Sequence, residues 1–591
     1  MKNNYILGIN QGHNATAALL HNGKIIACVS EERFRRIKNY SGTPTKAIDF
    51  CLRFAKIKPG DLDLVVISSI SPPPLLAAGV KSKKSSLVYS FTKNIYGFLT
   101  EDVEMLIPQL SYLNDFLYKL GGYLFLKNTK EKRVAEIKRI TGVSKDKIIF
   151  LDHHSTHAYS AVYGSPFVKQ KIKRILVFTN DAEGDGLSAT VSIYENGRIR
   201  KIAETKIRNS VGYFYYAITQ YLGLKPGEHE YKVMGLAPYA HDKDRDRIFD
   251  IMKDWLLVDK KNLSFKAKVH SHNFIKLCQK YLAEKRFDSI AAASQKLVED
   301  RMVEWIFASI KKTGVKIIVA GGGVFKNVKL NKMITELPKV DKYFVFPSPG
   351  DESNAIGACY YGFLEMFPKK LPEPVKDLYL GPSYTEGDIL KAINIYKRKV
   401  GGFTFKKVGN IEQKVARLLS NGEIVARFEG RSEWGDRALG NRSILADPKN
   451  RKSVEIINKM IKARDFWMPF APVISSDYSD VYIYDNKKTN GDYMMIAYDS
   501  KEKERDNFIA AMHAYDKTTR PQILKKENNP KYHKILEHFK KITGHGVLLN
   551  TSFNIHGEPI VCSPYDAVDT FMRSGLKYLA MEDFILSKKR L

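Results

Sequence analysis

The sequence lacks the features that mark a membrane or disulfide-rich protein. No stretch reaches the roughly eighteen apolar residues that a spanning helix needs. The short apolar run near the start, YILGI, leads into Asn-Gln-Gly rather than a small-residue cleavage site. The cysteines lie far apart and form no CxxC pair: Cys28, Cys51, Cys278, Cys359 and Cys562. We therefore expect a cytoplasmic protein without a transmembrane segment, zinc ribbon or disulfide framework.

Several catalytic motifs are also absent. There is no Walker A loop and no GxGxxG, so a nucleotide site here would be neither of the P-loop nor of the Rossmann type. There is no GxSxG and no Cys–His arrangement, so the sequence does not indicate catalysis by a covalent nucleophile.

Size and charge set broad limits. The chain has 591 residues, 44% of them apolar and 27% charged, which is typical of a folded protein with two to four domains. Its 95 basic against 64 acidic residues give a net charge of +31. Such an excess favours nucleotides, phosphorylated substrates, nucleic acid or anionic lipid as partners, but a lysine-rich proteome produces the same excess.

The pattern of strands predicts an α/β fold with two duplicated halves. The stretch ATAALLHNGKIIACVSEERF gives two strands around the turn HNGK, and LSATVSIYENGRIRKIAE repeats this scheme around ENGR. The stretches VKIIVAGGGVFKN and KYFVFPSPGDESNAIGACYYGFL each read as strand, glycine-rich loop and helix. Residues 71–147 are basic, aromatic and helical in pattern, and we interpret them as an insertion. Residues 371–387, rich in proline and charge, are the candidate linker.

Three histidines within HHSTHA raise the question of a metal site. His153 and His157 are four residues apart, so a helix would place both rings on one face, able to share one ion. The alternative is a polar helix start with spare imidazoles. Two histidines are too few for a protein metal site, and Asp351, in the turn SPGDESNAIG, is the best third ligand by residue type.

Two glycine-rich loops are candidates for nucleotide binding, because glycine lets backbone amides approach phosphates. On matching strands of a duplicated frame they indicate the scheme of actin-like and sugar-kinase-like ATPases. The candidate residues are Asp181, Gly184 and Gly186 in the first loop, and Gly321, Gly322, Gly323 and Asn327 in the second.

Three further residues are candidates for catalysis. His13 lies in the loop between the first two strands, where it could contact an acceptor or act as a base, or be an ordinary turn histidine. Glu228 and Lys232 lie in GEHEYKVMGLAPYA, which we interpret as a pocket loop, the alternative being a solvated loop.

The C-terminal third is dense in arginine interleaved with glycine, tryptophan and asparagine. Arginine forks onto phosphate or carboxylate oxygens, so this composition predicts an anion site. The candidates are Arg431, Arg437, Arg442, Lys462, Arg464, His513, Arg520, Asn550, Ser552 and Asn554.

Taken together, these stretches resemble the O-carbamoyltransferases of the NodU and CmcH type over nearly the whole chain. The motifs that carry the resemblance are GHNATAALLHNGKIIACVSEERF, DHHSTHAYSAVY, EYKVMGLAPY, AGGGVFKNVKLN, GDESNAIGA, GRSEWGDRALGNRSILADP, PFAPV, TTRPQ and NTSFNIHGEPIV. The chain departs from the family pattern at Asp436, where the family has proline, and at Met468, where it has arginine.

The resemblance implies two catalytic domains. Residues 1–370 would form a Kae1-like, actin-related transfer domain, and residues 388–591 a YrdC-like twisted α/β domain. In the second domain, carbamoyl phosphate and ATP, with Mg²⁺, would give carbamoyladenylate. In the first, a metal held by His153, His157 and Asp351 would bind the adenylate while the carbamoyl group passes to a hydroxyl of a small-molecule or glycan acceptor. The family implies iron, and nitrogen and oxygen ligands equally admit zinc or manganese.

Two other functions remain open at this stage. One is a threonylcarbamoyl-type tRNA-modifying enzyme, which the positive charge would suit, although GRSEWGDRALGNRS is typical of the small-molecule carbamoylators and nucleic acid is not expected as a partner. The other is an actin-like nucleotide-dependent scaffold, which would leave the C-terminal arginines without a task.

Overall fold

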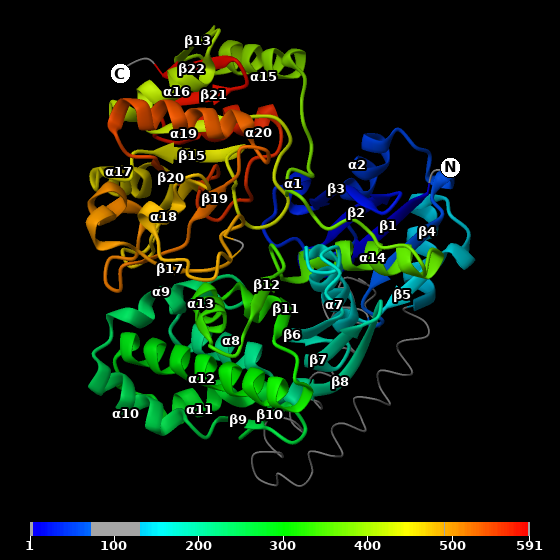
Figure 1. Ribbon diagram of the computed structural model, residues 1–591. Coiled ribbons are helices and arrows are strands. Elements are labelled where there is room, and N and C mark those ends of the chain that lie inside the picture. The colour runs from blue at the N-terminus through cyan, green and yellow to red at the C-terminus, as the bar shows by residue number, and fades with distance from the viewer. Residues whose placement is uncertain (1–3, 72–129, 490, 589–591) are drawn as a thin grey trace, which may run out of the picture. The chain divides into compact units, whose positions relative to one another are not determined.

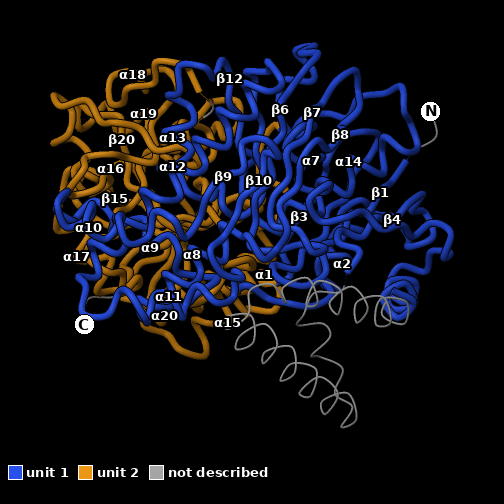
Figure 2. Tube along the Cα trace, turned by 90° about the horizontal axis from the view of Figure 1, so that it is seen from below, with its two compact units in different colours: residues 1–31, 39–375 blue, residues 32–38, 376–591 orange. Residues whose placement is uncertain are grey.

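The computed structural model describes residues 4–71, 130–489 and 491–588. The chain forms two compact units, one of Met1–Glu31 and Asn39–Val375, the other of Glu32–Lys38 and Lys376–Leu591 (Figure 2). None of the helices in the described part is both long and apolar enough to cross a membrane. All five cysteines are buried thiols outside any disulfide bond.

The first unit begins with a five-stranded sheet. β1 (Tyr5–Asn10), β2 (Thr16–His21) and β3 (Lys24–Ser30) form an antiparallel meander. β4 (Leu64–Ser68) pairs parallel to β1, and β5 (Ile148–Leu151) pairs parallel to β4. The sheet order is β3-β2-β1-β4-β5.

A second sheet repeats this order. β6 (Arg174–Gly184), β7 (Leu187–Glu195) and β8 (Arg198–Lys206) form the meander. β11 (Ile317–Gly321) pairs parallel to β6, and β12 (Lys342–Val345) pairs parallel to β11, giving β12-β11-β6-β7-β8. Equivalent strands pair in the same way in the two sheets, so the predicted duplication is confirmed.

The two hairpin turns share one local cause. Asn22 and Gly23 have φ angles of 49° and 86°, and Asn196 and Gly197 have 50° and 82°. Two consecutive residues with positive φ make the turn whose twist matches paired strands, and Asn-Gly is the sequence that adopts it most readily. The turns predicted at HNGK and ENGR are therefore present.

Helices α7 (His153–Gly164) and α14 (Asn354–Met366) pack together at the centre of this unit (Figure 1). Their backbones lie unusually close, since a Cβ added to Gly357 would lie 1.9 Å from the carbonyl oxygen of Thr156. Further helices of this unit include α2 (Thr45–Ala55), α8 (Val211–Tyr221), α9 (Glu230–Leu236), α10 (Asp242–Met252), α11 (Phe274–Tyr281), α12 (Phe287–Thr313) and α13 (Val328–Glu336). β9 (Leu256–Asp259) and β10 (Ser264–Ala267) form a small antiparallel ribbon.

The second unit is built on an eight-stranded mixed sheet of order β13-β22-β21-β14-β15-β20-β16-β19. These strands are β13 (Phe403–Lys407), β14 (Val425–Phe428), β15 (Arg442–Ala446), β16 (Ala471–Ser475), β19 (Gln522–Leu524), β20 (Val547–Ser552), β21 (Tyr578–Met581) and β22 (Phe584–Lys588).

Helices cover both faces of this sheet. Alternate residues of one strand point to opposite faces, and accordingly Ala426 and Phe428 belong to one apolar core while Val425 belongs to another. The first core includes α15 (Glu386–Lys399) and α20 (Pro564–Arg573), and the second includes α16 (Ile411–Ser420) and α19 (Pro530–Thr543). The predicted α/β class of this domain is thus confirmed.

The predicted linker contains the boundary between the two units and also the first residues of a helix. The two units divide between Val375 and Lys376, inside the candidate linker 371–387, and α15 already begins at Glu386. Of the predicted insertion 71–147, residues 72–129 lie outside the described residues, and 130–141 form a helix.

Candidate active site

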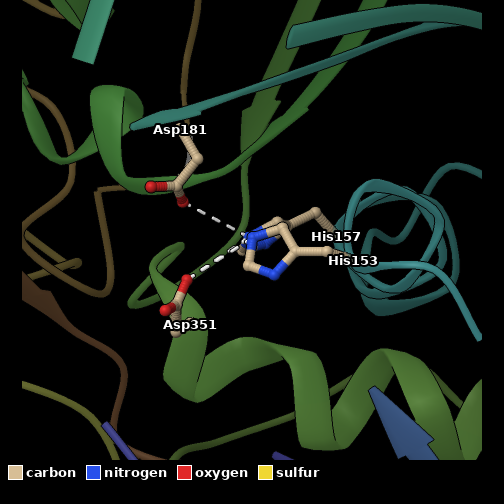
Figure 3. A group of neighbouring side chains, drawn as sticks. All are labelled: His153, His157, Asp181 and Asp351. Carbon is tan, nitrogen blue, oxygen red and sulfur yellow. Dashed lines mark hydrogen bonds and ion pairs between the residues drawn. The ribbon is translucent and has the colours of Figure 1, made fainter. Parts of the chain in front are cut away.

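His153 and His157 lie on the first two turns of α7, and Asp152 caps the N-terminus of this helix. Asp152, with extended backbone angles, accepts a hydrogen bond from the Ser155 N–H at 2.9 Å. The helix then places His153 and His157 on one face, as the four-residue spacing predicts. Their Nε2 atoms lie 3.1 Å apart, with the rings edge to face (Figure 3).

Two carboxylates approach these nitrogens from other elements (Figure 3). Asp351, at the turn before α14, has Oδ1 3.5 Å from His153 Nε2 and 3.9 Å from His157 Nε2. Asp181, on β6, has Oδ2 3.4 Å from His157 Nε2. One ligand atom from each of the four residues lies within 4.8 Å of the others. The structure thus brings together the predicted trio and adds Asp181, which the sequence indicated only as a nucleotide residue.

A second layer of contacts orients these ligands. The Ser353 hydroxyl lies 3.2 Å from His157 Nδ1, and the Asn354 amide lies 3.5 Å from His153 Nδ1. The Gly323 N–H donates to Asp181 Oδ2 at 2.7 Å. Partners on the far nitrogen of an imidazole fix its tautomer and ring orientation, as metal-binding histidines require.

The charges of this cluster suit a cation. Burial, reinforced by the neighbouring His153, lowers the pKa of His157 to about 4, so its ring is neutral at pH 7. Burial and the charge of Asp181 raise the pKa of Asp351 to about 7. Two carboxylates held this close repel each other, and a divalent cation relieves the repulsion. Neutral imidazole nitrogen with carboxylate oxygen is a donor set that fits iron, zinc or manganese.

The third histidine of the motif has a different setting. His154 is buried, and its Nδ1 lies 2.8 Å from the Thr179 hydroxyl of β6. Burial and the neighbouring His153 and His157 lower its pKa to about 3. His154 therefore packs the helix against the sheet as a neutral ring.

The glycines predicted to bind nucleotide lie around this cluster. A Cβ added to Gly184 would lie 2.2 Å from the His153 ring, and one on Gly321 would lie 3.0 Å from the His157 carbonyl oxygen. Gly322 has a φ of +99°, and a Cβ on Gly323 would lie 3.2 Å from Asp181 Oδ1. These four glycines let the histidine helix and Asp181 approach closely.

The remaining residues of the two loops differ in role. Gly186 lies in the β6–β7 turn with a φ of +81° and open space around its α-carbon. Asn327 caps α13 by accepting from the Leu330 N–H at 3.1 Å, and its amide pairs with Gln295.

Of the residues predicted for catalysis, His13 lies at this site. Its half-exposed ring has Nδ1 3.8 Å from Asp351 Oδ2. Glu228 forms an ion pair with Lys225, and Lys232 is buried on α9.

Three charged residues near the cluster, Lys326, Glu352 and Glu230, were not predicted from the sequence. The Lys326 Nζ lies 2.9 Å from Oε1 of the buried Glu352, next to Asp351 in the chain. Burial raises the pKa of Glu230, and Lys326 opposes that rise. Lys326 lies in AGGGVFKN and Glu352 in GDES, but neither motif shows that these two side chains form an ion pair.

In the second unit, several predicted basic residues gather. Burial and the charges of Arg437 and Arg464 lower the pKa of Arg520. Burial and the charges of Arg464 and Lys38 lower the pKa of Lys462. Cations that share a buried region repel one another unless an anion is bound between them. An anion bound among these residues would relieve the repulsion.

Polar residues of β20 and the loop after it frame this cluster. Lys462 Nζ donates to the Ser552 hydroxyl at 3.1 Å and to Asn554 Oδ1 at 2.7 Å. Arg464 donates to the Thr551 hydroxyl at 3.1 Å, and its guanidinium stacks on Phe470. Lys38, which the sequence did not indicate, belongs to this unit through the segment Glu32–Lys38.

Two of the predicted arginines donate hydrogen bonds to backbone carbonyl oxygens. Arg431 donates to the carbonyl oxygens of Gly381 and Leu380, at 3.0 and 2.5 Å. Arg442, fully buried, donates to those of Glu429 and Gly430, at 2.6 and 3.1 Å. From these contacts we infer that Arg431 and Arg442 hold the backbone of the arginine-rich loop in place.

His513 and Asn550 are buried beside other polar groups. The His513 Nδ1 lies 3.3 Å from Asp516 Oδ1, and the Asn550 amide donates to the Ala438 carbonyl at 3.0 Å. Asp436, at the family's proline position, is exposed.

Comparisons with known proteins bear on both units. The family model described as Carbamoyltransferase N-terminus matches residues 5–360, and Carbamoyltransferase C-terminus matches residues 416–588. An uncharacterized protein of Synechocystis sp. is 30% identical over 99% of this chain and 97% of its own length. The nodulation protein NolNO of Sinorhizobium fredii is 27% identical over 98% of this chain and 79% of its own length. Full-length HypF in its phosphate- and nucleotide-bound form aligns with a TM-score of 0.32 at 12% identity, covering 61% of this chain and 47% of that one.

Proposed function

The chain belongs to the carbamoyltransferase family and is an enzyme of that class, and on this premise we propose that it is an ATP-dependent O-carbamoyltransferase that works in two steps. In the first, carbamoyl phosphate, ATP and water give carbamoyladenylate, phosphate and pyrophosphate. In the second, an acceptor hydroxyl attacks the carbamoyl carbon, the bond to the phosphate oxygen breaks, and AMP leaves with a carbamoylated acceptor as product.

We assign the first step to residues 388–591. The observation that supports it is a cluster of cations, in which burial and the charges of Arg437 and Arg464 lower the pKa of Arg520. Burial and the charges of Arg464 and Lys38 likewise lower the pKa of Lys462. Two anionic substrates repel each other in water, and fixed positive charges offset that repulsion without reorganising. Ser552 and Asn554 position Lys462 for this role. Mg²⁺ would accompany ATP, as for other phosphoryl and nucleotidyl transfers.

We assign the second step to residues 1–370. The single observation that carries this assignment is the convergence of His153, His157, Asp181 and Asp351, with one ligand atom each within 4.8 Å. A divalent metal bound there would supply a Lewis acid for the phosphate oxygens of the adenylate. The family resemblance favours iron, and the nitrogen and oxygen donors admit zinc or manganese.

The side chains around this cluster would handle the acceptor. The half-exposed ring of His13, 3.8 Å from Asp351, is in reach of solvent and would accept the acceptor's proton as the hydroxyl attacks. The acceptor is a small molecule or glycan with a free hydroxyl. A cytoplasmic location stays a prediction, which the five buried cysteine thiols support.

One assay tests the proposal. The protein is mixed with ATP, Mg²⁺ and carbamoyl phosphate without acceptor, and pyrophosphate and adenylate are measured. We expect pyrophosphate release that depends on carbamoyl phosphate. Release that requires threonine and bicarbonate instead would favour the tRNA-modifying alternative, and no release in either mixture would exclude an adenylate route.

The division into two steps is tested by His157→Ala. We expect this variant to lose carbamoyl transfer to any acceptor and to keep pyrophosphate release at close to the wild-type rate. Equal loss of both reactions would contradict the assignment of separate sites.

A further inference from the structure

An ion pair between the partly exposed Lys326 and the buried Glu352 lies beside the four candidate metal ligands. Lys326 ends the short helical turn Gly323–Lys326, whose first N–H holds Asp181. Its Nζ lies 2.9 Å from Glu352 Oε1, and the Glu352 side chain is 2% exposed. The Ser348 hydroxyl donates to the same carboxylate at 2.5 Å and the Asn14 amide at 3.3 Å. Glu352 is thus held in place from three sides.

The backbone makes room for the lysine. A Cβ added to Gly350 would lie 2.7 Å from Lys326 Cε and Nζ, and 2.7 Å from Glu352 Oε2. The ammonium group therefore lies directly over residue 350, next to Asp351. Its charge adds to the lowering of the His157 pKa and opposes the rise in the Asp351 pKa. Lys326 is 29% exposed, so the group is near the cluster and still within reach of solvent.

A count of charges suggests what Lys326 does there. A divalent cation balances Asp181 and Asp351, and Lys326 balances Glu352, so the loaded site is neutral. Without the lysine it would carry a net negative charge. A nucleotide 5′-phosphate is itself an anion, so a lysine ammonium that contacts it adds to the attraction that a bound metal would supply.

We propose that Lys326 is the phosphate-binding side chain of the transfer site, its ammonium donating to a phosphoryl oxygen of the adenylate and of the AMP that leaves, with Glu352 positioning it. A lysine ammonium carries three donors, so it can contact Glu352 and a phosphate together. This inference rests on the proposed function of the same site.

The alternative is an ion pair that only stabilises the loop. Two substitutions distinguish phosphate binding from a purely structural role, because one removes a positive charge and the other a negative charge. Lys326→Gln and Glu352→Gln both abolish the ion pair, so a purely structural role predicts that both weaken AMP binding or that neither does. If Lys326 binds phosphate, Lys326→Gln weakens AMP binding, whereas Glu352→Gln leaves it equal or stronger.

The experiment is a calorimetric titration of the full chain, loaded with Mn²⁺, with AMP and with adenosine. It is done in the Arg520→Gln background, which weakens the second nucleotide site. Adenosine lacks the phosphate, so its affinity should be the same in all variants. We expect Lys326→Gln to lower AMP affinity about tenfold or more, the loss of one charge-assisted hydrogen bond, and Lys326→Arg to restore part of it.

Two controls complete the test. Lys329→Gln removes the same charge one turn further on and should change nothing, and metal content by elemental analysis should match across all variants. Equal AMP affinity in wild type and Lys326→Gln, or equal losses in Lys326→Gln and Glu352→Gln, would overturn the inference while leaving the proposed function standing. Absence of AMP binding in the wild-type chain together with absence of adenylate formation would instead remove the proposed function.

Discussion

The ring of His153 lies against the α-carbon of Gly184, so closely that a β-carbon there would be 2.2 Å from the ring. Gly184 ends β6, the strand that also carries Asp181. The absence of a side chain at residue 184 is thus what lets the histidine helix approach the strand that supplies an acidic ligand.

Substitution of Gly184 should therefore weaken metal binding more than it destabilises the fold. In Gly184→Ala the added methyl group displaces the His153 ring, and we expect lower metal content per chain, measured by elemental analysis after dialysis. Gly60→Ala is the control, because a Cβ at Gly60 meets nothing within 4 Å. Equal metal content in the two variants would contradict a role for the His153 ring as ligand.

The cap of α7 should contribute both to stability and to the site. Asp152→Ala removes the hydrogen bond to the Ser155 N–H, and we expect a cost of about 1 kcal/mol in the free energy of unfolding. Because His153 is the first residue of the helix, fraying of that turn should also weaken metal binding. Asp152→Ser, which keeps a capping oxygen, should restore most of both properties. Denaturant unfolding and metal titration measure them.

The cationic cluster of the second unit should make the protein respond to phosphate ions. Inorganic pyrophosphate relieves repulsion among Arg437, Arg464 and Arg520, so it should raise the melting temperature of the wild type. We expect Arg520→Gln to lose most of that increase and to raise the KM for ATP or carbamoyl phosphate about tenfold. Arg417→Gln, which removes an exposed arginine of α16, should behave as wild type. An unchanged response in Arg520→Gln would place the anion elsewhere.

A buried carboxyl pair predicts how stability varies with pH. Burial and the neighbouring Glu429 raise the pKa of Glu582 to about 7, while Lys531 contacts both carboxylates, at 2.7 Å from Glu429 and 3.4 Å from Glu582. Since the folded pKa lies above the ordinary value of 4.5, folded protein holds this proton more tightly than unfolded protein. Its contribution to stability is therefore complete below about pH 4.5 and is lost as pH rises through 7.

Glu582→Gln removes this titration. We expect the melting temperature of the variant, relative to wild type, to be higher at pH 8 than at pH 5. The comparison is made by calorimetry at both pH values. A difference that is the same at both, or of opposite sign, would show that Glu582 ionises normally in the folded protein.

The features that the sequence predicted well are local ones. The Asn-Gly turns at residues 22–23 and 196–197 follow from backbone preference alone, and the shared face of His153 and His157 follows from helical period. Such features depend on neighbours within a few residues. They could be placed without knowledge of the rest of the chain.

The features that the sequence did not predict are those that tertiary contacts decide. Asp181 could be assigned to a glycine-rich loop, but its meeting with His157 depends on how β6 passes α7. The arginine-rich loop shows which charges are present and not where each guanidinium points, so Arg442 could not be distinguished from Arg520. In the structure Arg442 donates to backbone carbonyls, whereas Arg520 lies among other cations.

The short segment Glu32–Lys38, placed with the second unit, has a consequence for how such an enzyme can be divided or recombined. Its Arg33 donates to the Gly435 carbonyl at 2.6 Å, and Arg36 donates to those of Ile560 and Pro559 at 2.7 and 2.9 Å. A gene cut once near codon 375 would yield a C-terminal product without these side chains. The second unit is thus incomplete without this segment, and chimeras that exchange the unit between relatives must also exchange the seven residues Glu32–Lys38.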